Sequence, residues 1–243
     1  MKKTLYSLSF ILVMTFAVCS AQAAIWYSQN FDGLADGDMA GQDDWELITD
    51  MSPDIGSPTV QSAVVHGSSG KALKVEAAQE VRRSFDPMHT GQQFFILYFR
   101  KEDDSADNTL HVYIGKEDHE WAAGPVIRIG AQSGDPAQVG AHDAGTVNPV
   151  APFVIGQWHQ IRIVVDYGAL SYDAYLDGAL IAEGYKFRKD IHDALGWIMI
   201  GFDAGVGVLG YYDDIILGDG DGLNVAAVDS VGKAATTWAE LKH

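Results

Sequence analysis

Short segments in which apolar and polar residues alternate recur along most of the chain, and this pattern constrains the fold more than any other feature. Alternation with a period of two is typical of a β-strand that buries one of its faces. No segment of comparable length before the C-terminal tail has the period of a helix. We therefore predict an all-β chain with strands at 25–31, 72–76, 94–102, 109–115, 125–131, 157–166, 171–176, 196–202 and 211–217.

Turn sequences separate these segments. The chain has 26 glycines, and glycine supplies the positive φ that tight turns require. The clearest hairpin signal is Asp177-Gly178, because this dipeptide favours a turn whose twist matches that of the flanking strands. Many short strands at this spacing fit two packed antiparallel sheets better than alternating strands and helices. The predicted fold class is a two-sheet antiparallel β-sandwich.

Burial and loop structure can be predicted at a few further positions. Trp45, Trp158 and Trp197 lie within apolar strand patterns, so we expect them in the core. Residues 134–152 are polar and rich in glycine and proline. They are predicted to form a long connection, either an ordered binding loop or a mobile one.

The first 23 residues have the layout of a secretory signal peptide. Lys2 and Lys3 precede an apolar run at 5–18, and Ala21-Gln22-Ala23 offers the small residues of a cleavage site before Ala24. A membrane anchor is the competing interpretation, but the run is shorter than the roughly 20 residues that span a bilayer. We predict an exported protein (secreted, periplasmic or at the cell surface) with no membrane span after cleavage. The only cysteine, Cys19, is lost with the signal, which excludes disulfides and cysteine-ligated zinc.

The net charge excludes another class of partner. The formal charge is −17, and it becomes −19 when the two lysines of the signal segment are removed, because these are its only charged residues. A strongly negative field repels nucleic acid and anionic lipid. We therefore predict no nucleic-acid partner.

Three stretches carry a further signal: Asn30–Leu34 with Gly41–Trp45, Gly156–Asp166 running on to Tyr175–Gly178, and Tyr212–Leu217. Together they resemble the laminin G-like, concanavalin A-like jelly-roll family that is common in exported bacterial proteins. They cover most of 25–218, which implies a jelly-roll domain at 24–218, followed by a linker and a short C-terminal tail at 219–243. The fold supports sugar-binding modules, adhesion domains, hydrolases and lyases, so the resemblance identifies no active site.

The resemblance also implies a structural calcium ion. Members of the family often hold Ca²⁺ between the first and last strands, with a closing-strand aspartate and backbone carbonyls as ligands. Asp32, Asp213 and Asp214 occupy the matching positions, and Ca²⁺ takes six to eight such oxygens. The competing interpretation is that these aspartates accept hydrogen bonds from backbone N–H groups in turns and edge strands.

Polar and aromatic side chains alternate with apolar ones on three predicted strands, 94–102, 109–115 and 125–131. If these strands are neighbours, the polar side chains share one outer face. Aromatic rings stack on sugar C–H faces, and arginine or histidine bonds hydroxyls and carboxylates, so such a face suits a glycan. The competing interpretation is a solvated face whose arginines pair with surplus acids. The predicted ligand-binding residues are Tyr98, Arg100, His111, Tyr113, Trp121 in a loop at the rim, and Arg128.

The sequence shows few of the patterns that are typical of catalytic sites. No strand carries the alternating acids that a retaining glycosidase places about 5–5.5 Å apart. Jelly-roll lyases use tyrosine or histidine for proton transfer and arginine to neutralise a uronate carboxylate, roles that Tyr113, His111 and Arg100 could fill. Lyase motifs are absent, and the negative charge opposes a polyanionic substrate. We predict an exported non-catalytic module, stabilised by Ca²⁺, that binds carbohydrate or a cell-surface glycan; the alternative is a polysaccharide lyase.

Overall fold

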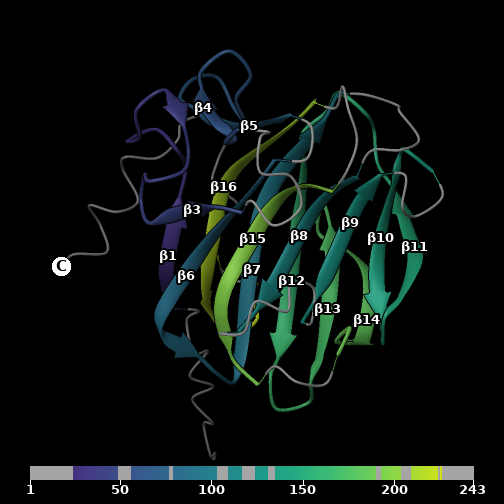
Figure 1. Ribbon diagram of the computed structural model, residues 1–243. Helices are drawn as coiled ribbons and strands as arrows, with labels where there is room; N and C mark the ends of the chain where they lie inside the picture. Colours follow the sequence, from purple (N-terminus) through teal and green to yellow (C-terminus); the bar gives the residue numbers. More distant parts are fainter. Residues whose placement is uncertain are drawn as a thin grey trace, which may run out of the picture.

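Two antiparallel sheets pack face to face in the computed structural model (Figure 1). The structure describes residues 24–48, 56–76, 79–102, 109–116, 124–130, 135–189, 193–203, 209–223 and 225, and the side chains of these except 202 and 203. None of these residues is helical, and so none of them forms a helix that could cross a membrane. The predicted all-β sandwich is confirmed. The signal segment, most of the C-terminal tail and Trp121 lie outside the described residues.

We call the first sheet the β7 sheet. Its central strands are long, and the strands at the β2 end are short. Strand β1 (Ile25–Gln29) pairs with β16 off the main order. That order is β14 (Ala179–Lys186), β13 (Ser171–Leu176), β12 (His159–Asp166), β7 (Gln92–Lys101), β16 (Leu209–Asp219), β5 (Ala72–Glu76), β4 (Thr59–Gln61) and β2 (Gly37–Asp38).

We call the second sheet the β8 sheet. Its strands are also antiparallel throughout. Two of them, β10 and β11, form a hairpin within 134–152, so the long loop predicted there is wrong. The order is β11 (Thr146–Pro152), β10 (Gln138–Asp143), β9 (Val126–Gly130), β8 (Thr109–Gly115), β15 (Leu195–Asp203), β6 (Glu80–His89) and β3 (Trp45–Leu47).

The core lies between the sheets and contains the apolar residues of the alternating segments, as predicted from the sequence. Phe95, Leu97 and Phe99 on β7 face Val112 and Ile114 on β8, and all five are buried in one cluster. The polar residues between them therefore point outward, as predicted.

The three tryptophans differ from one another. Trp45 is in the core, as predicted. Trp158 contacts Tyr211 on the outer side of the β7 sheet and is only half-buried. Trp197 is buried in a separate cluster outside the main core. An apolar pattern around a tryptophan therefore does not show whether the tryptophan itself lies in the core.

A β-bulge in β16 places two aspartates side by side. Asp213 pairs with Tyr98 and Ile216 with Ile96, so β16 has one residue more than β7 over this stretch. Asp214 takes a φ of 48°, the left-handed conformation found in bulges and turns. The extra residue keeps Tyr212 and Ile215 in the core on either side.

Candidate functional site

The predicted ligand-binding residues do not share one face. Strand β7 belongs to one sheet and strands β8 and β9 to the other. Tyr98 and Arg100 are therefore on the outer face of the β7 sheet, and the remaining described residues of the set are on the outer face of the β8 sheet. The connection after β7 crosses between sheets, and alternation carries no information about sheet membership. Arg100 consequently cannot join His111 and Tyr113 in the catalytic trio of the lyase alternative.

One row of residues crosses the outer face of the β8 sheet. The strand register places Glu80 on β6 opposite Gly201 on β15, Gly201 opposite His111, and His111 opposite Arg128 on β9. His111 Nε2 lies 3.0 Å from Glu80 Oε1. The row therefore brings an acid, a histidine and an arginine together from three strands.

Aromatic side chains pack beside this row. The Tyr113 ring stacks on His111 with centroids 4.2 Å apart, and the Arg128 guanidinium carbon lies 4.9 Å from the Tyr113 centroid. The Trp197 ring lies over Gly115, where an added Cβ would come within 2.1 Å of it. We call this surface the closed face: it comprises Glu80, His111, Tyr113, Arg128 and Trp197.

The closed face is buried, although it lies opposite the core. His111 and Tyr113 have 0% of their surface exposed, and Glu80 and Arg128 have 4%. Burying polar groups costs free energy unless they are paired, and such clusters are frequent at functional sites.

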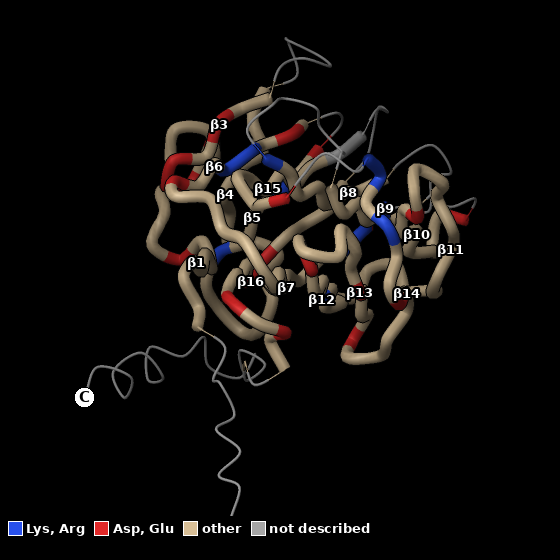
Figure 2. The backbone as a smooth tube through the Cα atoms, turned by 90° about the horizontal axis from the view of Figure 1, so that it is seen from below, with Lys and Arg blue, Asp and Glu red and all other residues tan. Residues whose placement is uncertain are grey.

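His142 on β10 extends the closed face. It is 4% exposed, and burial, together with the nearby charges of Arg128 and Arg188, lowers its pKa to about 4. Neither ring nitrogen has a hydrogen-bond partner within the described part of the chain. Basic positions of the backbone lie beside β6 and β9 and also along other strands, and acidic positions are spread widely (Figure 2).

The outer face of the β7 sheet is more accessible. Arg100 pairs with Tyr211 on β16, and Tyr98 pairs with Gln160 on β12. Gln160 Nε2 donates to the Tyr98 hydroxyl oxygen at 2.9 Å, and Arg100 Nε donates to Glu102 at 2.6 Å. Partial burial raises the pKa of the Tyr98 hydroxyl, which therefore stays protonated. We call this surface the open face: it comprises Tyr98, Arg100, Trp158, Gln160 and Tyr211.

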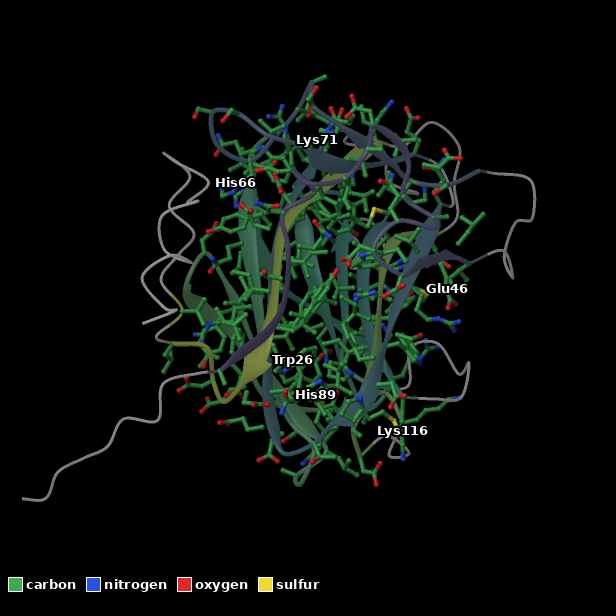
Figure 3. All side chains as sticks on the ribbon, turned by 90° about the vertical axis from the view of Figure 1, so that its left-hand side faces the viewer. Trp26, Glu46, His66, Lys71, His89 and Lys116 are labelled. Atoms are coloured by element: carbon green, nitrogen blue, oxygen red, sulfur yellow. The ribbon has the colours of Figure 1, made fainter. Side chains whose placement is uncertain are left out.

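A loop carries His66 onto the open face (Figure 3). The His66 ring stacks on Tyr98 with centroids 3.7 Å apart, and its edge approaches Trp158 at 5.6 Å. The His66 backbone N–H donates to Asp213 Oδ2 at 3.0 Å, and His66 Nδ1 lies 2.8 Å from Asp214 Oδ2. The bulge aspartates thus hold this loop against the aromatic side chains.

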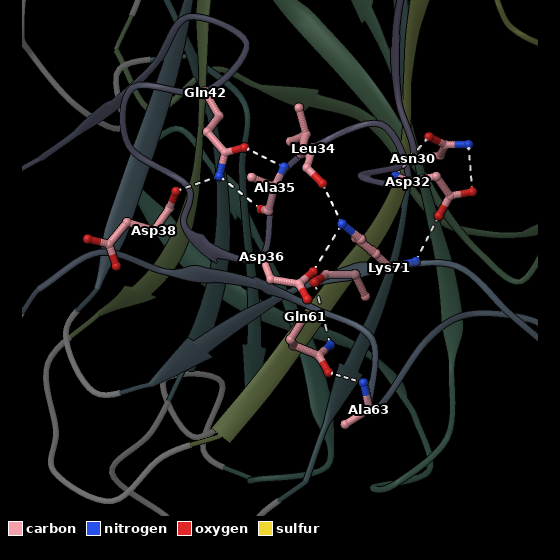
Figure 4. A network of polar contacts seen from close by, with 11 residues as sticks. Asn30, Asp32, Leu34, Ala35, Asp36, Asp38, Gln42, Gln61, Ala63 and Lys71 are labelled. Atoms are coloured by element: carbon pink, nitrogen blue, oxygen red, sulfur yellow. Dashed lines mark hydrogen bonds and ion pairs between the residues drawn. The ribbon is translucent and has the colours of Figure 1, made fainter.

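The three candidate calcium ligands are engaged by nitrogen donors instead. Both oxygens of Asp213 accept backbone N–H bonds, from His66 and from Asp214. Asp32 accepts one from Lys71, whose ammonium group also contacts Asp36 at 3.0 Å (Figure 4). The described residues include no group of three side chains suited to a metal. Nitrogen donors thus occupy oxygens of Asp213 that a Ca²⁺ ion would use, and calcium binding at these aspartates stays a prediction.

Sequence reasoning missed several residues of both faces. Glu80 lies on β6, whose sequence has adjacent arginines and a proline instead of regular alternation. His142 lies in the stretch predicted as a loop, and His66 lies in a Gly/Ser-rich turn region with no periodic signal. The useful signal for Trp158 was its position beside His159, since neighbours in a strand face opposite sides.

No family model and no curated protein matches the sequence. Solved structures resemble the fold. A sialidase superposes with a TM-score of 0.59 at 11% identity, covering 82% of this chain and 18% of its own. Domain 4 of AbnA, a GH43 extracellular arabinanase from Geobacillus stearothermophilus in complex with arabinotriose, gives 0.55 at 17% identity, covering 82% and 93%. Cellulose induced protein Cip1 gives 0.53 at 17% identity, covering 79% and 96%. These similarities establish the β-sandwich fold.

Proposed function

We propose that this chain is an exported, non-catalytic module that binds glycans on its open face. The observation that carries the proposal is that Tyr98 and Trp158 are half-buried beside Arg100 and Gln160 on the outer side of a sheet. Aromatic rings offer apolar surfaces to sugar C–H groups, and arginine and glutamine donate hydrogen bonds to hydroxyls. Such a surface provides both parts of sugar recognition.

Accessibility favours the open face over the closed one. Arg100 keeps 29% of its side-chain surface exposed, whereas His111 and Tyr113 keep none. A sugar chain can stack only on rings that it can reach. The fold similarity to an arabinanase domain in complex with arabinotriose supports the same ligand class.

Titration with neutral oligosaccharides tests the proposal. We expect arabino-, xylo- or cello-oligosaccharides to bind with an affinity measurable by calorimetry. Tyr98→Ala and Trp158→Ala should each weaken binding by about 5-fold to 30-fold, because aromatic residues at binding hot spots contribute roughly 1–2 kcal/mol each.

Two half-buried arginines provide the matched control. Arg100 pairs with Glu102 on the open face, and Arg82 pairs with Glu46 at the outer side of the other sheet. Arg100→Ala should weaken oligosaccharide binding, and Arg82→Ala should leave it unchanged. Equal effects of the two substitutions, or no binding across the panel, would reject the open face as the site.

A polysaccharide lyase is the second candidate, favoured by one observation: the Tyr113 ring contacts both His111 and Arg128. Because these side chains are buried, a uronate would reach them only if the closed face opened. In such a β-elimination a base removes the proton at C5 of a uronate. The C4–O bond then breaks, its oxygen leaves with a proton, and a C4=C5 double bond forms, while an arginine neutralises the carboxylate. Incubation with alginate, ulvan and pectin tests it: rising ultraviolet absorbance from unsaturated products would support a lyase, and none would remove it.

Export has a separate test. The mass of protein recovered outside the cytoplasm should correspond to a chain that begins at Ala24. An intact N-terminus on exported protein would reject cleavage at Ala23.

A further inference from the structure

His66 has one ring nitrogen that no protein group uses on the open face. Its Nδ1 lies 2.8 Å from Asp214 Oδ2, and this carboxylate is 3% exposed. A carboxylate accepts hydrogen bonds, so the single proton of a neutral imidazole belongs on Nδ1, and Nε2 is an acceptor. Within the described part of the chain Nε2 has no hydrogen-bond partner. It is not one of the described side-chain atoms that are both buried and unpaired, and so it reaches solvent.

The hydroxyl of Tyr98 is a donor beside this acceptor. Its oxygen accepts the side-chain N–H of Gln160 at 2.9 Å, whereas its own proton has no acceptor among the residues that the structure describes. Burial raises its pKa, so this hydroxyl stays protonated. The rings of Tyr98 and His66 stack with centroids 3.7 Å apart. The open face therefore presents one donor and one acceptor on two rings that are in contact.

The position of this pair is fixed before any ligand binds. The His66 backbone N–H donates to Asp213 Oδ2 at 3.0 Å, and the Asp213 side chain is fully buried. The edge of the His66 ring also packs against Trp158, with centroids 5.6 Å apart. Groups that are already held in place lose little freedom when a ligand binds. The donor and the acceptor can thus discriminate between ligands instead of adapting to each.

The charges around the pair do not favour an anion. Burial first, and then the negative charges of Asp214 and Asp177, raise the pKa of the Tyr98 hydroxyl. The cation of the open face, Arg100, has its Nε 2.6 Å from a carboxylate oxygen of Glu102, so an opposite charge offsets its own. A carboxylate on the ligand would therefore meet negative charge at the hydroxyl.

A sugar hydroxyl fits this arrangement, because a hydroxyl both donates and accepts, whereas an ionised carboxylate only accepts. We propose that His66 and Tyr98 make the open face specific for neutral sugars. A ligand hydroxyl, or two neighbouring hydroxyls, donates to His66 Nε2 and accepts the proton of the Tyr98 hydroxyl. This inference rests on the proposed glycan binding and adds the class of sugar to it. Stacking alone accepts any sugar ring, but this pair rejects uronates.

Calorimetry with two sets of ligands tests the specificity. The full chain is titrated at pH 8, with EDTA present so that no metal ion adds charge. One set contains the arabino-, xylo- and cello-oligosaccharides, and the other contains tetrasaccharides of galacturonate and of alginate. The best neutral ligand should bind at least about tenfold more tightly than either uronate. Equal or tighter binding of a uronate would overturn the specificity, although the open face would still be a glycan site.

Two substitutions keep the aromatic rings and remove the polar atoms. Tyr98→Phe removes the donor, and His66→Phe removes the acceptor. Each should weaken binding of the best neutral ligand by about 3-fold to 10-fold, which corresponds to one hydrogen bond. Wild-type affinity in Tyr98→Phe would mean that stacking alone holds the ligand and would overturn the pair. This variant also decides if His66→Phe does not fold, because the lost hydroxyl has only Gln160 as a partner in the described part of the chain.

His89 provides the matched control. Its ring stacks on Trp26 with centroids 3.6 Å apart, at the side of the molecule where β1 and β6 lie (Figure 3). His89→Phe also replaces a stacked imidazole by a phenyl ring, but it should leave oligosaccharide affinity unchanged. A loss as large as that in His66→Phe would show that the effect is not specific to the open face and would overturn the proposal.

Histidine ¹⁵N NMR at pH 8 separates a hydrogen bond to the ligand from an effect on packing. The His66 signals are identified by their absence in His66→Phe. In the free protein the proton should be on Nδ1, and the Nε2 signal should shift when the best neutral ligand is added, while the His89 signals do not. A proton on Nε2, or an Nε2 signal that ligand leaves unchanged, would overturn the role of His66. Failure of every neutral oligosaccharide to bind would instead reject the open face itself, and this inference with it.

Discussion

The two outer faces place the same residue types in opposite environments. On the open face, Tyr98 is half-buried and Arg100 forms a partly exposed pair with Glu102. On the closed face, Tyr113 is fully buried and has Arg128 against its ring. Solvent can satisfy polar groups on the first surface, whereas the second must satisfy them within the protein. Alternation distinguishes core from non-core, but it does not distinguish an accessible surface from a buried one.

Among substitutions on the two faces, we expect His111→Ala to lower the unfolding free energy most. His111→Ala removes a fully buried ring that stacks on Tyr113 and lies 3.0 Å from the buried Glu80 carboxylate, which should cost about 3 kcal/mol or more of unfolding free energy. Arg100→Ala leaves the partly exposed Glu102 to solvent and should cost less than about 1 kcal/mol. Urea unfolding measures both values. Similar losses would mean that the two faces do not differ in this way.

A pH effect of similar size should come from His142. Its pKa is lowered to about 4 in the folded protein from 6.5, so the unfolded chain binds the extra proton between these values. Stability therefore falls as pH decreases from about 6.5 to about 4, by about 2–3 kcal/mol. The quantity to measure is the difference between wild type and His142→Gln in urea unfolding. Parallel pH profiles would contradict the prediction.

Packing on the closed face should make Gly115 intolerant of a side chain. In Gly115→Ala the new methyl group meets the Trp197 ring at 2.1 Å, and forced repacking of a buried ring costs about 1–3 kcal/mol. Gly33→Ala is the control, because nothing lies within 4 Å of its added Cβ. Thermal unfolding should distinguish the two. An unchanged midpoint in Gly115→Ala would show that Trp197 is loosely held.

We expect the smallest loss of unfolding free energy when the contacts of His66 with the bulge aspartates are removed. His66→Ala removes the contact with Asp214 and the stack on Tyr98, and should cost about 1 kcal/mol. Because N–H donors occupy these carboxylates, EDTA should leave the unfolding midpoint unchanged. A midpoint that rises with added Ca²⁺ would instead support the ion implied by the family resemblance.

The strands with regular alternation were predictable, and so was the side to which their residues point. Val112 and Tyr113 face opposite sides as expected, because side-chain direction follows from local geometry. The separation of Tyr98 from Tyr113 was not predictable, since it depends on how distant strands pair. Burial of His111 and His142 depends on the tertiary structure around their face, which no local pattern encodes.

The position of β16 has a consequence for the order in which the molecule can form. This strand, ending at Asp219, joins the β14-β13-β12-β7 half of its sheet to the β5-β4-β2 half, and it also pairs with β1. Until residues 209–219 have left the ribosome, the two halves have no common neighbour. Assembly of this layer therefore waits until these residues have been synthesised, and it depends on contacts between distant parts of the chain, which form slowly. For the exported chain that we propose, such a delay would leave more time to cross a membrane before folding.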